Sequence, residues 1–444
     1  MNTGTEWRAS AFRRFPTALA VATLSLGLVV DSARCEAPGP NLADSQTVPA
    51  SEDVNAVARW NEIATETINS TAVSPAVTPE EQRPVWVIDL ATVHLAIYDA
   101  AIAIARTHEP FAVLPTVPAA GASVDAAVSA AAYGVLRGLF PNRSNHYQAT
   151  YESMLAALPE GVAKARGLAL GAEVAAGILA LRANDGRNVT LPPYVPGTEP
   201  GEFRGIGPGT RIVPFIRPFT LTDAAQFRSP GPPALGSEAY AIAFEEVRTL
   251  GGTASTQRTP QQTEAARFHA ETPTTYWARN LRQFAKSQST VAENARLSAL
   301  IWVSLADSAI GCFESKYHYD FWRPASAVPL ADTDGNAATQ ADPTWTPLGP
   351  VPDHPEHPAA HACTSAALQE TLSGYFGAGD LSFAFDSTLS GTTHSFASLG
   401  AMAEETQLAR IWGGMHFRSA LVDGAELGAR TGRWVASRHF RPRR

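Results

Sequence analysis

Three short segments in the last third of the 444-residue chain combine residue types that bind anions and transfer protons. They are residues 316–324 (KYHYDFWRP), residues 358–361 (PAAH) and residues 410–416 (RIWGGMH). One ammonium and two guanidinium groups supply cationic hydrogen-bond donors suited to a tetrahedral oxyanion. Two histidines remain, one to bond the central atom of that anion and one to transfer a proton. The candidate residues are Lys316, Arg323, His361, Arg410 and His416.

The ends of predicted helices should position these segments. Residues 290–317 carry apolar residues at the i, i+3, i+4, i+8 spacing of a core-facing helix, so Lys316 falls at its end. The second segment leads from a proline-rich loop into a helix, and a Gly-Gly pair interrupts two helical runs before His416 opens the second. Two helix N-termini would therefore direct free N–H groups and a favourable dipole toward the anion.

The same helical period runs through the rest of the chain and predicts an all-α fold of helical bundles. Residues 188–235 break it with many prolines and glycines and predict a long loop, either a surface excursion or the seam between two helical halves. We therefore divide the chain into a leader (1–37), an N-terminal helical half (38–187), this loop, and a C-terminal helical half (236–444) with the three segments. The predicted helices cover residues 51–70, 79–105, 122–139, 145–157, 161–183, 237–250, 260–269, 275–286, 290–317, 361–376, 396–412 and 416–439.

The composition excludes several classes of protein. Charged residues make up 17% of the chain and the net charge is −8, which excludes a disordered chain and general nucleic-acid binding. Three cysteines exclude a disulfide-rich scaffold and a cysteine-ligated zinc or iron–sulfur protein. The composition fits a globular enzyme and leaves a homo-oligomer open.

The N-terminus has the layout of a secretory signal peptide. Arg8, Arg13 and Arg14 precede an uncharged apolar run, residues 15–30, which ends in small residues. A membrane anchor is the alternative, but the run is shorter than the roughly 20 residues that a membrane span needs. We expect no later segment to span a membrane, and we expect a periplasmic or secreted protein.

Together the three segments resemble the superfamily that joins vanadium-dependent haloperoxidases with type 2 phosphatidic acid phosphatases (PAP2). Its pattern is Lys, six residues, Arg-Pro; then Pro-Ser-Gly-His; then Arg, five residues, His. The resemblance implies a helical fold built around two four-helix bundles, with vanadate as the cofactor. Lys316, Arg323 and Arg410 would then hold the equatorial oxygens of vanadate or phosphate. His416 would be the axial ligand of vanadium, or the phosphohistidine nucleophile of a phosphatase, and His361 would be the acid–base residue.

Two positions depart from the pattern of this superfamily. Ala359-Ala360 stand where the family has Ser-Gly, so a hydroxyl donor is lost while the backbone N–H of Ala360 remains to bind the cofactor. Ala420 stands where the family often has an aspartate that orients the last histidine. We expect Asp423 or a backbone carbonyl to replace that aspartate.

Each residue alone also has an ordinary structural explanation. Lys316 could complement the C-terminal dipole of its helix. Arg410 could pair on the surface, Arg323-Pro324 could form a helix-exit turn, His361 could pack in the core and His416 could cap a helix. Their joint occurrence, in order and with both spacings intact, favours the site.

Other groupings of polar residues are weaker. His354, His357 and His361 resemble a zinc set, but the prolines between them prevent a shared helix face. Residues 332–336 resemble the start of a calcium loop without its glycine or its closing glutamate, so a polar turn is expected. Three further histidines have no comparable partners in the sequence and are expected to be packing or surface residues: His94, His318 and His394.

Three functions remain open. The first is a vanadate-dependent peroxidase that oxidises halide or an organic substrate with hydrogen peroxide. The second is an acid phosphatase that hydrolyses small phosphate esters through a phosphohistidine at the same site, because bound vanadate resembles the five-coordinate state of phosphoryl transfer. The third is a non-catalytic oxyanion-binding protein, suggested by Ala359 and Ala420.

Two cysteines remain once Cys35 is removed with the leader. Cys312 lies four residues before Lys316 and Cys363 lies two after His361, so convergence of the motifs would bring the thiols together. In an oxidising compartment they could form a disulfide, and buried free thiols are the alternative.

Overall fold

The computed structural model describes residues 55–70, 86–205, 210–271, 273–285, 289–377 and 381–443. The predicted leader, residues 1–37, lies outside the described residues. The described part is helical apart from a two-stranded sheet. The prediction of an all-α fold is therefore confirmed.

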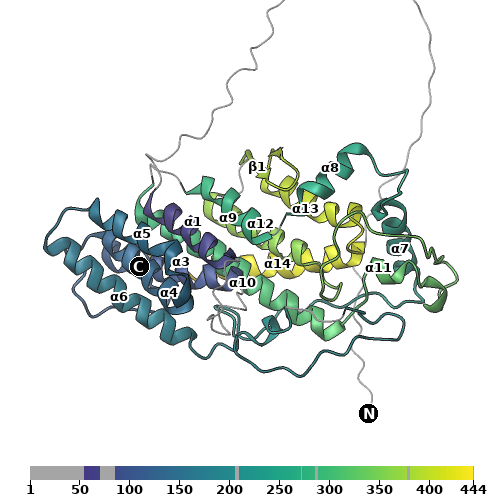
Figure 1. Cartoon of the computed structure of the whole chain (residues 1–444), viewed down its shortest axis with the longest axis horizontal. Coiled ribbons are helices and arrows are strands. Elements are labelled where there is room, and N and C mark those ends of the chain that lie inside the picture. The colour runs from purple at the N-terminus through teal and green to yellow at the C-terminus, as the bar shows by residue number, and fades with distance from the viewer. Residues whose placement is uncertain are drawn as a thin grey trace, which may run out of the picture. The chain divides into compact units, whose positions relative to one another are not determined.

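The helices of the described N-terminal part pack on one another around a core of alanine, valine, leucine and isoleucine side chains. Side chains of Asn55 and Ser123 cap two of these helices by accepting backbone N–H groups. Gly171 lets its helix approach the helix that carries Ala127, because a Cβ at residue 171 would lie 2.1 Å from the carbonyl oxygen of Ala127. The elements are α1 (Ala56–Asn69), α3 (Trp86–Ala105), α4 (Val124–Leu139), η1 (Pro141–Arg143), α5 (Ser144–Ala156) and α6 (Val162–Arg182) (Figure 1).

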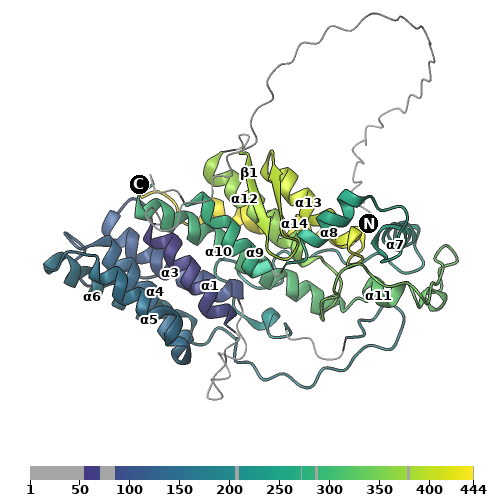
Figure 2. The same cartoon turned by 45° about the horizontal axis from the view of Figure 1, so that its top comes forward.

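The helices after the long loop carry the three motif segments. The longest described helix, α10, packs against α3 and also against α12 and α14, as Figures 1 and 2 show. It begins with a capping box between Thr290 and Glu293. The elements are α7 (Glu238–Gly251), α8 (Pro260–Phe268), α9 (Pro273–Leu281), η3 (Arg282–Phe284), α10 (Val291–Tyr319), α11 (Pro324–Ala327), η4 (Ala331–Thr333), α12 (Ala360–Phe376), α13 (Leu399–Trp412) and α14 (Arg418–Arg438).

The predicted long loop between α6 and α7 is present, and among its described residues only η2 (Val213–Phe215) is helical. The loop is tied to α10 at two points. The N–H groups of residues 219–221 donate to the buried carboxylate of Asp307 over 2.7–3.3 Å, and Phe203 donates its N–H to the carbonyl of Asp320 (2.8 Å). The loop is therefore an ordered excursion fixed to the helix that carries Lys316.

A β-hairpin after α12 is not among the predicted elements. Strands β1 (Phe383–Ser387) and β2 (Thr392–Phe396) pair antiparallel, with Phe385 opposite His394. Each strand has only five residues, too few for a clear period-2 pattern to emerge from the sequence. Buried Phe385 and Phe396 anchor the hairpin to the core.

Two helices, α3 and α10, are long and apolar enough to qualify as membrane spans by length and composition, although no later span is predicted from the sequence. In each, however, 83% of the most apolar window is buried inside the structure. That burial is typical of the core helices of a globular domain.

Candidate functional site

Lys316 lies in the last turn of α10 with its side chain fully buried. The helix ends there because Asp320 adopts the left-handed conformation (φ 46°) and donates its N–H to the carbonyl of Lys316 (2.8 Å). The Nζ atom of Lys316 does not complement its own helix. It donates to the carbonyl oxygens of Pro355 (2.9 Å) and Glu356 (3.0 Å), so Lys316 holds the segment that leads into α12.

Arg323 is positioned by the proline that follows it. A residue before proline favours extended backbone, and Arg323 has φ −91° and ψ 160° directly before α11. Its buried guanidinium donates from Nε to the carbonyl of His354 (2.7 Å) and from Nη1 to the carbonyl of Met415 (3.0 Å). Nη1 also lies 3.4 Å from Nε2 of His416. Arg323 thus joins the segment before α12 to the segment before α14.

Arg410 lies in the last turn of α13 and is buried. Its Nη1 donates to the carbonyl of His269 (3.0 Å), whereas its buried Nε has no hydrogen-bond partner among the described residues. The Gly-Gly turn after α13 needs glycine at Gly414, where φ is 73° and a Cβ would lie 2.5 Å from the carbonyl oxygen of Gly251. This turn separates Arg410 from the His416 segment that precedes α14.

A buried carboxylate orients His416. Nδ1 of His416 lies 3.0 Å from Oε1 of Glu356, which also accepts the backbone N–H of Phe417 (2.9 Å). Because this oxygen is an acceptor, Nδ1 carries the ring proton, and Nε2 presents a lone pair. The expectation that Asp423 or a backbone carbonyl orients this ring is wrong, because Glu356 fills that role.

His361 lies in the first turn of α12 and is partly buried. Its imidazole has no hydrogen-bond partner among the described residues. Ala359 is the N-cap of α12 and offers no side-chain cap, and its own N–H donates to the carbonyl of Ala420 (2.9 Å). The first N–H groups of the helix, including that of Ala360, are therefore left without a side-chain acceptor.

The candidate residues concentrate positive charge in a buried place. Burial lowers the pKa of Lys316 well below its ordinary value, and the charge of Arg323 lowers it further. Burial lowers the pKa of Arg323 to about 10. Burial, with the charge of Arg323 in second place, lowers the pKa of Arg410 to about 9. Burial raises the pKa of Glu356, against the effect of the neighbouring cations.

An oxyanion among these groups would offset both their repulsion and their loss of hydration. The buried Nε of Arg410 is a donor without a partner among the described residues. Nε2 of His416 carries a lone pair that could bond a central atom. The donor set therefore fits a tetrahedral anion such as phosphate or vanadate.

The histidines of the rival zinc set have separate partners. Nδ1 of His354 lies 2.9 Å from Nη2 of Arg323. Nε2 of His357 lies 3.0 Å from Oδ2 of Asp423, so this carboxylate pairs with His357 and not with His416. These rings do not converge on a shared point with His361.

The structure agrees with the expectations for residues 332–336, His94 and His318, but not with that for His394. Residues 332–336 form the expected polar turn, closed by an N–H donated to an aspartate over 2.8 Å. His94 is buried and His318 is exposed, as predicted. The prediction that His394 has no comparable partners is wrong, because it contacts the carboxylates of Glu264 and Glu405.

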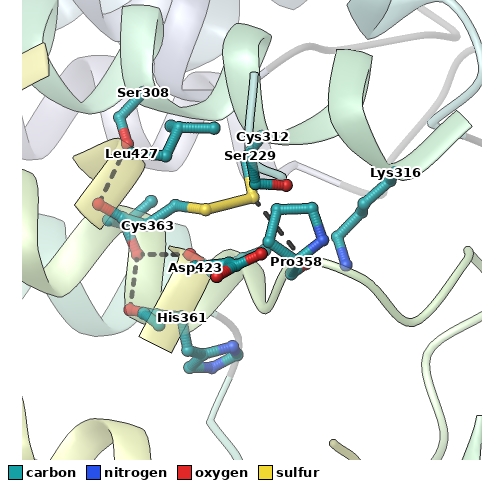
Figure 3. The surroundings of a disulfide bond; sticks show 12 residues. Ser229, Ser308, Cys312, Lys316, Pro358, His361, Cys363, Asp423 and Leu427 are labelled. Atoms are coloured by element: carbon teal, nitrogen blue, oxygen red, sulfur yellow. Dashed lines mark hydrogen bonds between the residues drawn. A yellow bond between two sulfur atoms is a disulfide. The ribbon is translucent and has the colours of Figure 1, made fainter. Parts of the chain in front are cut away.

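The two cysteines of the motif region form a disulfide that joins α10 to α12 (Figure 3). Their Cα atoms lie 6.4 Å apart, and both residues are fully buried. Cys312 lies about one helical turn before Lys316, and Cys363 lies two residues after His361. The bridge therefore fixes two helix ends that carry candidate site residues.

Two contributors to the site are not among the predicted residues. Glu356 lies in the proline-rich segment just before His361, and a carboxylate so close to a candidate histidine is a signal that could have identified it. His269 gives no such signal, because its contribution is a backbone carbonyl 141 positions from Arg410 in the sequence.

Comparisons with known proteins identify similar sequences and folds. Residues 296–443 match the family described as the VCPO second helical-bundle domain, and these residues include all the candidate site residues. The vanadium chloroperoxidase of Curvularia inaequalis is 28% identical over 180 residues, which are 33% of this chain and 29% of that protein. The alignment thus spans less than a third of that relative.

Solved structures share the fold over most of both chains. A bacterial vanadium-dependent iodoperoxidase superposes with a TM-score of 0.69 and 23% identity, covering 86% of this chain and 94% of that one. A bacterial vanadium-dependent chloroperoxidase in its holo form superposes with a TM-score of 0.67 and 15% identity, covering 86% of this chain and 97% of that one. The chain therefore shares the fold of these solved haloperoxidases, and its residues 296–443 match the VCPO second helical-bundle domain.

Proposed function

We propose that the protein is a vanadate-dependent peroxidase that oxidises a halide or an organic substrate with hydrogen peroxide. The observation that carries the proposal is the buried His416–Glu356 pair, which leaves Nε2 of His416 beside the buried cations Lys316, Arg323 and Arg410. The domain match over residues 296–443 supports the choice of vanadate as the anion.

In this proposal the cations neutralise and orient the anion. Lys316 and Arg323 also donate hydrogen bonds to carbonyl groups of the segment before α12. They therefore hold that segment in place as well as supplying positive charge. The unpartnered Nε of Arg410 would donate to an anion oxygen, and so would the N–H of Ala360 at the start of α12. Nε2 of His416 would hold the central atom of the anion. Bound vanadate would supply Lewis-acid activation of peroxide without changing its oxidation state.

His361 is the proton carrier in this proposal. Its ring has no hydrogen-bond partner among the described residues and lies on the first turn of α12, near Arg410 and Lys316. A ring without a fixed partner would be free to accept a proton from hydrogen peroxide at one of its nitrogens and to release it again.

An acid phosphatase is the second candidate, because the same His416–Glu356 pair would suit a phosphohistidine nucleophile acting on small phosphate esters. Non-catalytic oxyanion binding has less support. It was suggested by Ala359 and Ala420, and Glu356 supplies the orienting carboxylate that Ala420 lacks.

We also propose that the protein is exported to the periplasm or secreted. The Cys312–Cys363 disulfide is typical of an oxidising compartment and agrees with the leader predicted from residues 1–37.

One purified sample tests these functions. Bromide and iodide oxidation by hydrogen peroxide is measured before and after reconstitution with orthovanadate, and aryl-phosphate hydrolysis is measured beside it. We expect halide oxidation that depends on added vanadate and is absent from His416→Ala. Hydrolysis of the ester without halide oxidation would identify the phosphatase, and neither activity would leave only anion binding.

A further inference from the structure

A second cluster of titratable side chains lies next to the oxyanion site but outside it. Nε2 of His269 and Nδ1 of His394 both approach Oε1 of Glu405, at 3.0 and 2.6 Å. One possible ligand atom from each of these three residues lies within 4.8 Å of the other two. The sequence separates these residues by up to 136 positions, so the fold alone assembles the cluster.

Three structural elements hold the cluster in place. His269 is the C-cap of α8, His394 lies in β2 and Glu405 lies in α13. The ring of His394 stacks on Phe268 with a centroid distance of 3.8 Å and an interplanar angle of 12°, which fixes the direction of Nδ1. Side chains held this way are preorganised for a ligand.

The outward-facing ring nitrogens have the partners that metal-binding histidines usually have. Nε2 of His394 contacts a carboxylate oxygen of Glu264, whose other oxygen accepts the hydroxyl of Thr392 (2.5 Å). Nδ1 of His269 lies 3.5 Å from the hydroxyl of Thr406. Such outer partners fix the orientation of a ligating ring and raise its basicity.

We propose that His269, His394 and Glu405 bind a zinc ion, with water at the open position. Two imidazoles and one carboxylate form a donor set that zinc uses when it keeps a position for water. The side chains of Glu405 and Glu264 are 31% and 37% exposed, whereas that of His269 is 1% exposed, so an ion can enter from the solvent side past the carboxylates. A divalent cation would also balance the two carboxylate charges.

The zinc ion would fasten α8, β2 and α13 together. The carbonyl of His269 accepts the hydrogen bond from Nη1 of Arg410. By fixing His269, the metal would therefore also fix the hydrogen-bond acceptor that positions Arg410. Zinc binding itself does not depend on vanadate or on the proposed peroxidase activity. The two proposals can therefore fail separately.

The competing arrangement is a hydrogen-bonded network without metal. In it, His394 contacts Glu405 through Nδ1 and Glu264 through Nε2, with no ion between the side chains. Metal-binding measurements distinguish the two arrangements.

The experiment is a calorimetric titration of zinc chloride into the full chain, stripped of metal and free of affinity tags. We expect one equivalent to bind, and we expect cobalt(II) substitution to give the visible absorption of a low-coordinate site. Glu405→Gln keeps the size and hydrogen bonding of the side chain but removes its charge, and we expect it to weaken zinc binding at least tenfold. His394→Ala should do the same, and His146→Ala, on α5, is the matched control with unchanged binding.

Folding of each variant is checked by circular dichroism, and Glu405→Gln is informative even where His394→Ala does not fold. The proposal is overturned if the wild-type chain binds no zinc up to millimolar concentration. It is equally overturned if Glu405→Gln and His146→Ala both bind zinc as the wild type does, because the bound ion then lies elsewhere.

Discussion

Glu356 and His416, 60 residues apart in the sequence, meet in a buried hydrogen bond of 3.0 Å between Oε1 and Nδ1. The same oxygen accepts the N–H of Phe417, so one carboxylate fixes both the ring and the backbone just before α14. The bond sets which nitrogen of His416 faces the cations. Glu356 also supplies the carboxylate that orients the His416 ring, although Ala420 stands where an aspartate would be expected.

Replacing Glu356 by glutamine should therefore weaken vanadate binding and slow turnover, each by about tenfold to a hundredfold, as losses of outer-shell partners do. Glutamine can still accept the N–H of Phe417, but it no longer holds the proton on Nδ1 by charge. Vanadate affinity by calorimetry, together with kcat and KM, measures the effect. Glu246→Gln, at an exposed salt bridge with Arg418, is the control. Unchanged vanadate affinity in the folded Glu356 variant would show that the carboxylate has only a structural role.

Removing the second histidine should separate binding from turnover. In His361→Ala we expect a vanadate affinity within a few-fold of that of the wild type. We expect turnover to fall by about a hundredfold or more, because a proton carrier contributes to the reaction and little to anion binding. Steady-state rates over a range of peroxide concentrations check this. The exposed His318 serves as a control, since His318→Ala should leave both quantities unchanged. Full turnover without His361 would assign the proton transfer to another group.

The disulfide should contribute substantially to stability. Cys312 and Cys363 are separated by 51 positions, for which the chain-entropy model gives about 4 kcal/mol at most. Denaturant unfolding of wild type and of the double variant Cys312→Ser/Cys363→Ser measures the difference in free energy of unfolding. Exported, denatured and unreduced protein should show no alkylatable thiol at these positions. Two alkylatable thiols would contradict the bridge.

The sequence predicts the helical framework well, because helices depend on local patterns. Apolar spacing predicts α10, the proline after Arg323 fixes its extended backbone, and the Gly-Gly turn predicts the break before α14. Spacing within each segment also selects the five candidate site residues, whose roles stay a prediction.

The sequence predicts the approach of Cys312 to Cys363, but it does not predict the polar contacts between distant segments. The Glu356–His416 bond crosses 60 positions, and the Arg410–His269 bond crosses 141. The sequence indicates no comparable partners for His394, although the hairpin brings its ring to two carboxylates. Local patterns carry no information about such partners.

Restoring a hydroxyl at Ala359 should affect both the helix and the reaction. Serine is a favoured N-cap, and Ala359 caps α12 without a side-chain bond, so Ala359→Ser should stabilise the protein by about 1 kcal/mol. A hydroxyl that donates to an anion oxygen should also raise turnover, with about 2.7–4 kcal/mol of barrier lowering as the upper bound. Melting temperature and kcat are measured together. Unchanged or lower turnover at a maintained melting temperature would mean that the oxyanion geometry differs from the family pattern.

The buried cations Lys316, Arg323 and Arg410, together with His416, are proposed to bind vanadate. Calorimetric titration of orthovanadate into the wild-type chain, Arg410→Ala, Lys316→Ala and the exposed control Arg433→Ala tests it. We predict stoichiometric binding to wild type and to Arg433→Ala, and about tenfold to a hundredfold weaker binding to each of the other two, since charge-assisted hydrogen bonds contribute roughly 1.5–3 kcal/mol each. Wild-type affinity in both Arg410→Ala and Lys316→Ala would contradict the claim.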